Sequence, residues 1–424
     1  MKYRNSRKAH TIMDQLIVSG SNFATGVILV RGLGLEQFGR FTVAYALILL
    51  ANNVQLSFIS SPMISLGSLC SSMDARRSYV RGMFGIQVIF CFLATLIGAL
   101  TAIAFLYLHP QPGGMRLLPA FIVGIALFLM QDWLRRYYFT IGKAKSSVWN
   151  DAVSYLLQAV VLAGLMYIHR LTLNSALWSI GITSGAAFVL GMMFERIRCS
   201  LKEVREAWRH SQKFSRDLAI ANQLQWFVYQ GAMLIGAGVL GAEAAGSVRA
   251  TQNVVGPVNV AFQAMENLVP IKAGEEMRRG GIQQAAKFLF QFAIHGFVVL
   301  FVVFLGLSFF SREFLIFFYG HKVAVYAGIL NLQMVYFLLA WPLRQFTYLF
   351  RTIEKTSSIL MASIMAAVTS LLLIYPCVRS FNALGIMVAA VAGQLANLLY
   401  MSIVWMRMRP SVMEKQEHSV ATVG

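Results

Sequence analysis

The chain has 424 residues, of which 58% are hydrophobic and only 12% are charged, and its net charge is +19. Soluble domains have about 25% charged residues, so this composition excludes a soluble globular protein and indicates one that spans a membrane. The basic residues are spread over the loops between apolar stretches and are not interleaved with stacking aromatics, which excludes a nucleic-acid-binding protein. Anionic phospholipid headgroups are the expected counter-charge.

About twelve stretches are apolar and long enough, at about 20 residues each, to cross the hydrocarbon layer of a bilayer. They cover residues 12–30, 41–58, 83–108, 117–134, 148–168, 174–194, 219–240, 245–270, 288–310, 325–343, 358–376 and 384–406. Most of the Lys and Arg residues fall in loops that share the side of the amino terminus. The positive-inside rule therefore predicts an all-α polytopic membrane protein with both termini in the cytoplasm.

In the first stretch, polar residues cover one side of the expected helix: Asp14, Gln15, Ser21, Asn22 and Thr25. Polar groups inside a bilayer are costly and normally face a bundle interior or a wet cavity. Asp14 lies near the cytoplasmic end of the stretch, so it is either a cavity residue or a solvated residue at the helix start. In the second stretch, Asn52 is a further candidate cavity residue.

The fourth stretch ends in a charged group formed by Gln131, Asp132, Arg135 and Arg136. Asp132 and Arg136 are four residues apart, a spacing that suits an ion pair on one helix face. Asp151, near the start of the fifth stretch, is expected to join this group. We consider a gate or ion-coupling role for Asp132, Arg135 and Asp151, against the simpler alternative that such residues only anchor the topology.

The seventh stretch carries amides beside aromatics, including Gln225, a combination that suits sugar hydroxyls and equally suits a polar contact between helices. The polar residues of the eighth stretch fall at helical spacing and predict one stripe: Arg249, Gln252, Asn253, Asn259, Gln263, Glu266 and Asn267. Pro257 is expected to interrupt this helix near its middle. We expect Arg249 and Arg344 to face Asp132, Asp151 and Glu266 in one cavity, which favours an anionic, hydroxyl-rich cargo because arginine binds phosphate in a bidentate manner.

Two segments in different halves share the frame Leu-Gly-x-Glu-x-x-Gly, residues 33–39 and 240–246. A weaker similarity joins Leu134-Arg135-Arg136 to Leu343-Arg344-Gln345. Together they predict a parallel internal repeat of two six-helix bundles. The expected organisation is a bundle over 1–194, a cytoplasmic amphipathic basic linker over 195–217, a second bundle over 218–406 and a cytoplasmic tail over 407–424. In the linker, Ile197, Leu201, Val204 and Trp208 form an apolar face expected to lie on the inner leaflet.

The sequence contains no nucleotide-binding glycine-rich loop and no zinc-protease motif, and the expected outer loops are short. Its cysteines, Cys70, Cys91, Cys199 and Cys377, do not have metal-ligand spacing. We therefore expect neither an enzyme nor a bound metal or cofactor.

Several motifs resemble the polysaccharide transport proteins known as Wzx-type flippases. They are Asp14-Gln15 with Asn22, the turn Arg31-Gly32-Leu33-Gly34 with Phe38-Gly39, Pro62, Gln131-Asp132-x-x-Arg135-Arg136 before Tyr137-Tyr138-Phe139, Ala245-Gly246 with Arg249-Ala250-x-Gln252-Asn253, and Glu266-Asn267 before Pro270. The resemblance covers nearly the whole chain, and its motifs are shared across the multidrug/oligosaccharidyl-lipid/polysaccharide exporter superfamily. That superfamily also includes multidrug and toxin extrusion antiporters and lipid II flippases; the twelve spans expected here differ from the fourteen of lipid II flippases.

The resemblance implies a flippase of a bacterial inner membrane that moves undecaprenyl-pyrophosphate-linked oligosaccharide by alternating access, for O-antigen or exopolysaccharide assembly. It implies coupling to a proton or sodium gradient, with the ion left open, and cooperation with a polysaccharide polymerase and a chain-length regulator. Two alternatives stay open: a cation-coupled drug or metabolite exporter, and a non-transporting scaffold of a polysaccharide-assembly complex.

Overall fold

The computed structural model describes residues 2–68, 70, 72–108, 110, 113–353 and 355–421. Within these ranges it describes all side chains except those of residues 2–12, 14, 213–214, 217–222, 224–225, 228–229, 259–261, 263–264, 266–268, 271, 356 and 409–421. All regular secondary structure in the described residues is helical, as the sequence predicts. The chain divides into two compact units, Met1–Trp226 and Phe227–Gly424.

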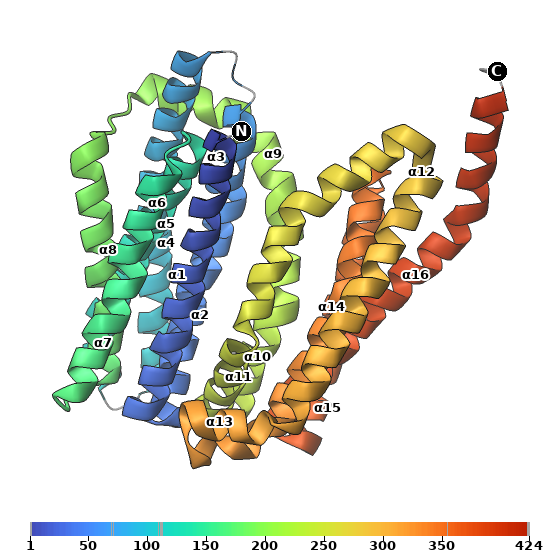
Figure 1. The fold of residues 1–424 in the computed structure, drawn as a ribbon. Coiled ribbons are helices and arrows are strands. Elements are labelled where there is room, and N and C mark those ends of the chain that lie inside the picture. The colour runs from blue at the N-terminus through green and yellow to red at the C-terminus, as the bar shows by residue number, and fades with distance from the viewer. Residues whose placement is uncertain are drawn as a thin grey trace. The chain divides into compact units, whose positions relative to one another are not determined.

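The first unit contains α1 (Lys2–Leu33), α2 (Leu35–Gln55), η1 (Leu56–Ser60), α3 (Ser61–Ser68), α4 (Met73–Leu108), α5 (Gly114–Thr140), α6 (Ala144–Asp151), η2 (Ala152–Leu156), α7 (Leu157–Tyr167), α8 (Leu173–Glu195) and α9 (Leu201–Trp226) (Figure 1). Two of these elements, η1 and η2, are single π-helical turns that continue α2 and α6 without a break. In this unit α5 packs along α8 and α4, and α1 packs along α6 and α7.

The second unit contains η3 (Phe227–Gly231), α10 (Ala232–Leu240), α11 (Ala242–Val254), α12 (Gly256–Phe309), α13 (Ser311–Tyr319), η4 (His321–Tyr326), α14 (Ala327–Thr352), α15 (Thr356–Phe381) and α16 (Ala383–Ala421) (Figure 1). The long α12 consists of two helices, because Gly280 and Gly281 have non-helical backbone angles. In this unit α14 packs against α12 and α16, and α15 lies along α16.

Ten helices in the described part of the chain are long and apolar enough to cross a membrane, two fewer than the sequence predicts. The two expected spans outside this set are 219–240 and 245–270. Both are helical, but several of their side chains lie outside those that the structure describes, and the second is divided by a backbone break at Val255. The described structure is therefore an all-α multi-span membrane protein with about ten candidate spans.

The break in the eighth predicted span lies at Val255, just before the Pro257 expected to cause it. Proline is tolerated in the first turn of a helix, where its missing N–H would have no partner, so the chain starts the new helix α12 at Gly256. The predicted polar stripe is consequently divided between α11 and α12 and does not run along one straight helix.

The repeated Leu-Gly frame adopts the same backbone in both units. Gly34 separates α1 from α2 with φ 78° and ψ 168°, and Gly241 separates α10 from α11 with φ 91° and ψ 175°. Each glycine N–H donates to the carbonyl four residues earlier, at 3.0 and 2.9 Å. Only glycine adopts this region readily, which explains its presence at both corners.

The second sequence similarity, between residues 134–136 and 343–345, must be shifted by three residues to match the structure. The turn after α5 and the turn after α14 share the same hydrogen bonds: Lys143 N to Tyr138 O and Lys355 N to Phe350 O are both 2.8 Å long. Counting back from these turns, Arg344 corresponds to Asp132, whereas the sequence alignment paired it with Arg135. At this repeated position the first unit therefore has the acidic Asp132, and the second unit has the basic Arg344.

Most of the predicted amphipathic linker, from Leu201 on, lies in α9, which packs on α4 and η1 through a face of small residues: Ala207, Ser211 and Ser215. The Ser215 hydroxyl donates to the Phe58 carbonyl at 2.8 Å. The predicted apolar face is divided, because Ile197 is buried while Leu201 is 89% exposed. Thus part of this face stabilises the first unit and part remains at the surface.

Candidate functional site

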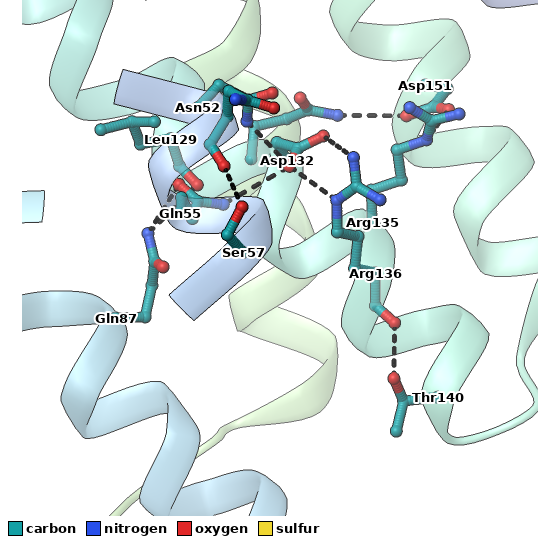
Figure 2. Close-up of polar contacts among 12 residues, drawn as sticks. Asn52, Gln55, Ser57, Gln87, Leu129, Asp132, Arg135, Arg136, Thr140 and Asp151 are labelled. Carbon is teal, nitrogen blue, oxygen red and sulfur yellow. Dashed lines mark hydrogen bonds and ion pairs between the residues drawn. The ribbon is translucent and has the colours of Figure 1, made fainter. Parts of the chain in front are cut away.

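A network of charged and amide side chains lies inside the first unit, centred on Asp132 of α5 (Figure 2). Its carboxylate forms an ion pair with Arg136, whose Nε lies 2.8 Å from Oδ2. The same carboxylate oxygen accepts hydrogen bonds from Asn52 Nδ2 at 2.9 Å and from Gln55 Nε2 at 3.4 Å, both on α2. Asp132 is only 3% exposed, so its charge is stabilised by these protein groups and not by solvent.

A second ion pair stands beside the first. Arg135 Nε lies 2.7 Å from Asp151 Oδ2, and the Asp151 side chain is fully buried. Gln131 Nε2 donates to Asp151 Oδ1 at 3.1 Å and to Asn150 Oδ1 at 2.9 Å. This pair joins α5 to the end of α6.

Gln87 extends the network to α4. Its Nε2 donates to Gln55 Oε1 at 3.2 Å and to the Leu129 carbonyl at 3.3 Å. A chain of hydrogen bonds therefore runs from Gln87 through Gln55 to Asp132, and it links three helices to one carboxylate.

The two acids and two arginines balance in charge. A buried ion pair stabilises a protein little more than an apolar pair of similar volume. Removing one partner, however, leaves an uncompensated buried charge at a cost of about 3–5 kcal/mol in stability. Protonating either carboxylate would have a similar local effect, since the arginine would lose its counter-ion. The arrangement can therefore convert proton binding into a change in how α5 is held against α2 or α6.

The two helices that contact α5 in this network, α2 and α6, each become π-helical next to it. Gln55 is the last residue of α2 before η1, and Asp151 is the last residue of α6 before η2. π-helical turns are rare and occur frequently at functional sites. Their placement on two sides of the same network distinguishes it from an ordinary contact between helices.

The structure brings together the candidates Asn52, Asp132, Arg135 and Asp151 of the first unit. Arg136 belongs to the same network, with the spacing that the sequence suggested for an ion pair. Asn22 is half-buried on α1. The side chain of Asp14 lies outside the described residues.

Asp132 and Asp151 pair with Arg136 and Arg135 of their own unit, as the sequence suggested for Asp132 and Arg136. The physical reason is proximity, because these arginines come from the same turn of α5 as Asp132 and stand next to the end of α6.

The network also contains Gln55, Gln87 and Asn150, to which no sequence pattern assigned a role. A usable signal was present for the first two: Gln55 lies one helical turn after Asn52, and Gln87 is an amide within an otherwise apolar span. Asn150 directly precedes Asp151, but only the fold shows that it faces Gln131.

In the second unit, Arg249 and Gln252 of α11 lie together, with Arg249 Nη1 donating to Gln252 Oε1 at 3.4 Å. The hydroxyl of Tyr319, at the end of α13, is located beside Asn253 and the Arg249 guanidinium. Burial raises the pKa of this hydroxyl, so it stays protonated and can donate. Tyr319 was not predicted from the sequence.

Arg344 on α14 lies over the ring of Phe262, 4.8 Å from its centroid. Phe262 also contacts Trp341, with ring centroids 5.6 Å apart. The remaining predicted residues, Gln225, Asn259, Gln263, Glu266 and Asn267, have side chains outside those that the structure describes. Among the described residues, no group of His, Cys, Asp and Glu could hold a metal ion.

No family model and no curated protein matches the sequence. Solved structures do match. An inward-facing multidrug resistance MATE family transporter of the MOP superfamily has a TM-score of 0.75 at 13% identity, over 95% of this chain and 96% of that chain. The lipid II flippase MurJ in an inward closed conformation has a TM-score of 0.70 at 13% identity, over 94% and 87%. A MOP superfamily transporter from Pyrococcus furiosus has a TM-score of 0.60 at 15% identity, over 97% and 94%. The chain is thus an all-α multi-span membrane protein with the fold of the MOP superfamily transporters.

Proposed function

We propose that the chain is a flippase that translocates undecaprenyl-pyrophosphate-linked oligosaccharide repeat units across the bacterial inner membrane by alternating access, for O-antigen or exopolysaccharide biosynthesis. The observation that carries the proposal is the paired charge network inside a fold shared with a lipid II flippase. In this proposal both termini are cytoplasmic, and the protein has no catalytic role.

The chemistry of the second unit favours an anionic, hydroxyl-rich cargo. Arg249 stays charged throughout the physiological range and can bind a phosphate through two N–H groups. Gln252, Asn253 and the Tyr319 hydroxyl add neutral donors beside it, of the kind that sugar hydroxyls pair with. Arg344, with Asn22, Gln225, Asn259, Gln263 and Asn267, completes the proposed cargo-binding set.

The network of the first unit is proposed to couple transport to an ion gradient. Asp132, Arg135 and Asp151 would change partners when a carboxylate binds a cation, and Asp14 and Glu266 remain further candidates. Because an alternating-access transporter needs two states of similar free energy, a pair of buried ion pairs that can open is a suitable biasing element.

A cation-coupled multidrug or metabolite exporter is the second candidate, favoured by the likeness to MATE transporters. Against it, both buried carboxylates of the first unit are already paired with arginines, so they offer no net negative charge to a cationic drug. A non-transporting scaffold is a third candidate, and it would tolerate changes at Arg249.

The proposal also includes partners. A polysaccharide polymerase and a chain-length regulator would act after translocation. Anionic phospholipids would bind the exposed basic surface of α9, which carries Lys202, Arg205 and Arg209 near the exposed Leu201.

A deletion strain complemented with variants tests the function. We expect wild type to restore surface polysaccharide and Arg249→Ala to fail while remaining in the membrane at normal amount. Arg170→Ala, at an exposed turn of the first unit, is the matched control and should complement. Normal polysaccharide in the deletion strain, together with a new sensitivity to organic cations, would support the exporter instead, and full complementation by Arg249→Ala would discard the proposed cargo site.

A further inference from the structure

The short helix α13 connects two membrane spans of the second unit and presents an apolar face. It lies at the end of α12 and contacts η4 and the start of α14 (Figure 1). Phe310, at the start of the helix, and Phe314 and Phe317 follow one another at helical spacing, and all three are exposed, Phe317 by 72%. These three residues are called the phenylalanine face below. A surface of this kind marks contact with a membrane or with another protein.

Another side of α13 is fixed to the protein. Ser311, Leu315 and Tyr319 are spaced four residues apart, and all three are buried. The Tyr319 hydroxyl is located beside Asn253 of α11. Since packing holds this side of the helix, the phenylalanine face is directed away from the unit.

The phenylalanine face follows directly on exposed apolar residues of α12. Val302, Leu305 and Phe309 lie on one side of this candidate span, at i, i+3 and i+7, and all are exposed. Phe310 is the next residue after Phe309, so the exposed apolar positions continue from the span into α13. An exposed apolar side of a membrane span contacts lipid, and the surface that continues it is therefore expected to meet the same bilayer.

Charged residues accompany the phenylalanine face. Arg312 and Glu313 of α13 and Lys322 of η4 are exposed. Positions 312 and 313 belong to neither the exposed phenylalanine spacing nor the buried spacing, so they form a third, polar side of the helix. At the depth of the headgroups, Arg312 and Lys322 could reach lipid phosphates while their apolar stems stay against the protein.

We propose that α13 binds the bilayer surface and lies in its plane, with the phenylalanine face directed into the upper part of the acyl chains. Amphipathic helices bind in this way, with the apolar side about 5–10 Å inside the boundary between headgroups and acyl chains. Lipid explains the patch better than a protein partner does, because the patch continues a lipid-facing span and has phosphate-binding side chains next to it.

This placement also bears on the proposed cargo residues. Tyr319 is the last residue of α13, and its hydroxyl lies beside Asn253 and the Arg249 guanidinium. A helix fixed at the membrane surface would therefore hold these two residues close to headgroup depth. That is where the pyrophosphate of a lipid-linked oligosaccharide lies, a consequence that rests on the proposed function.

The test uses the full chain, with its four cysteines replaced by alanine, in liposomes of phosphatidylethanolamine and phosphatidylglycerol. A nitroxide label is attached to Phe317→Cys or, as the matched control on the same helix, to Arg312→Cys. Power-saturation electron paramagnetic resonance compares collisions with oxygen, which is concentrated in lipid, and with a water-soluble nickel chelate. We expect oxygen to dominate at position 317, at a depth of about 5–10 Å, and the nickel chelate to dominate at position 312.

A second measurement leaves the native cysteines in place. The fluorescence that Phe317→Trp adds to that of wild type should be quenched more by lipids brominated near the carbonyl end of the acyl chain than by lipids brominated near the terminal methyl. Equal access of the nickel chelate to both labels would overturn the proposal and favour a surface for a protein partner. Stronger quenching by the terminal bromines would also overturn it, because α13 would then lie deep in the hydrocarbon. No cargo is present, so neither result decides whether the chain flips a glycolipid.

Discussion

At the level of single residues, the two buried arginine–carboxylate pairs are expected to contribute most to the stability of the first unit. Arg135→Ala would leave the fully buried Asp151 without its ion-pair partner, and we expect a loss of about 3–5 kcal/mol in the free energy of unfolding. The double variant Arg135→Met/Asp151→Leu removes both charges and should recover most of that loss. Thermal unfolding of the purified chain in one detergent measures this.

The exposed Arg170→Ala serves as the control and should unfold as wild type does. Equal unfolding temperatures for Arg135→Ala and Arg170→Ala would contradict a structural role for the buried pair.

The corner glycines provide a second test at this scale. Gly34→Ala and Gly241→Ala each place a side chain at a positive φ, which costs about 1–3 kcal/mol. The space around both positions is open, with no atom within 4 Å of an added Cβ, so the cost would come from the backbone alone. Gly164→Ala in α7 meets equally open space at a helical position and should be neutral or stabilising by up to about 1 kcal/mol. The opposite ranking in thermal unfolding would contradict this reading of the two corners.

Sequence reasoning located the charged residues of the network better than the amides. Asp132 and Arg136 could be paired because helical spacing places them on one face, and Asp151 could be added because a charge inside a span needs a partner. Gln55 and Gln87 belong to different helices, and no spacing rule brings them together. Tyr319 belongs to a different helix from Arg249, and no spacing rule in the sequence relates the two.

At the level of elements, α9 is held to α4 by close backbone contact and by one acid. A Cβ on Gly82 would collide with the Glu203 carbonyl, so the close approach of the two helices at this point requires glycine. Glu203 pairs with Arg81 at 2.7 Å and accepts from Ser78 at 3.1 Å. The linker helix is thereby attached to the first unit.

This attachment predicts a dependence on pH. Partial burial would raise the pKa of Glu203, but hydrogen bonds from Ser200, Arg81 and Ser78 outweigh it and hold the pKa below its ordinary value. The stabilisation is therefore complete above the ordinary value of about 4.3 and is lost as the pH falls through the folded value. Arg81 is 45% exposed, so the effect should be below about 1 kcal/mol.

Hydrogen exchange of the α9 amides, after correction for the intrinsic effect of pH, measures it. We expect faster opening of α9 in acid for wild type and pH-independent opening for Glu203→Gln. The same acid response in both proteins would assign the attachment to other groups.

The sequence indicated which segments of the two units correspond, but it did not give the correct residue-by-residue register for all of them. The Leu-Gly frame gave the correct correspondence because glycine is required at both corners. The second similarity rested on matching Leu-Arg pairs, which carry no such backbone requirement, and the hydrogen-bonded turns at Lys143 and Lys355 move it by three residues.

At the level of the whole molecule, composition and hydropathy were sufficient for an all-α multi-span protein, because a bilayer leaves few alternatives. Hydropathy does not report the break at Val255 in the eighth expected span, because it averages over a window of residues. The cargo cannot be read from the fold, which lipid II flippases and multidrug transporters share at 13% identity to this chain.

The leaflet in which the lipid-linked oligosaccharide resides is the most direct test of the flippase proposal. It can be measured in spheroplasts with a membrane-impermeant reagent that modifies the glycan. We predict a protected glycan in the deletion strain and in cells carrying Arg249→Ala, and an accessible glycan when wild type is restored. An accessible glycan in the deletion strain, equal to that of wild type, would contradict the proposal that this chain moves it across the membrane.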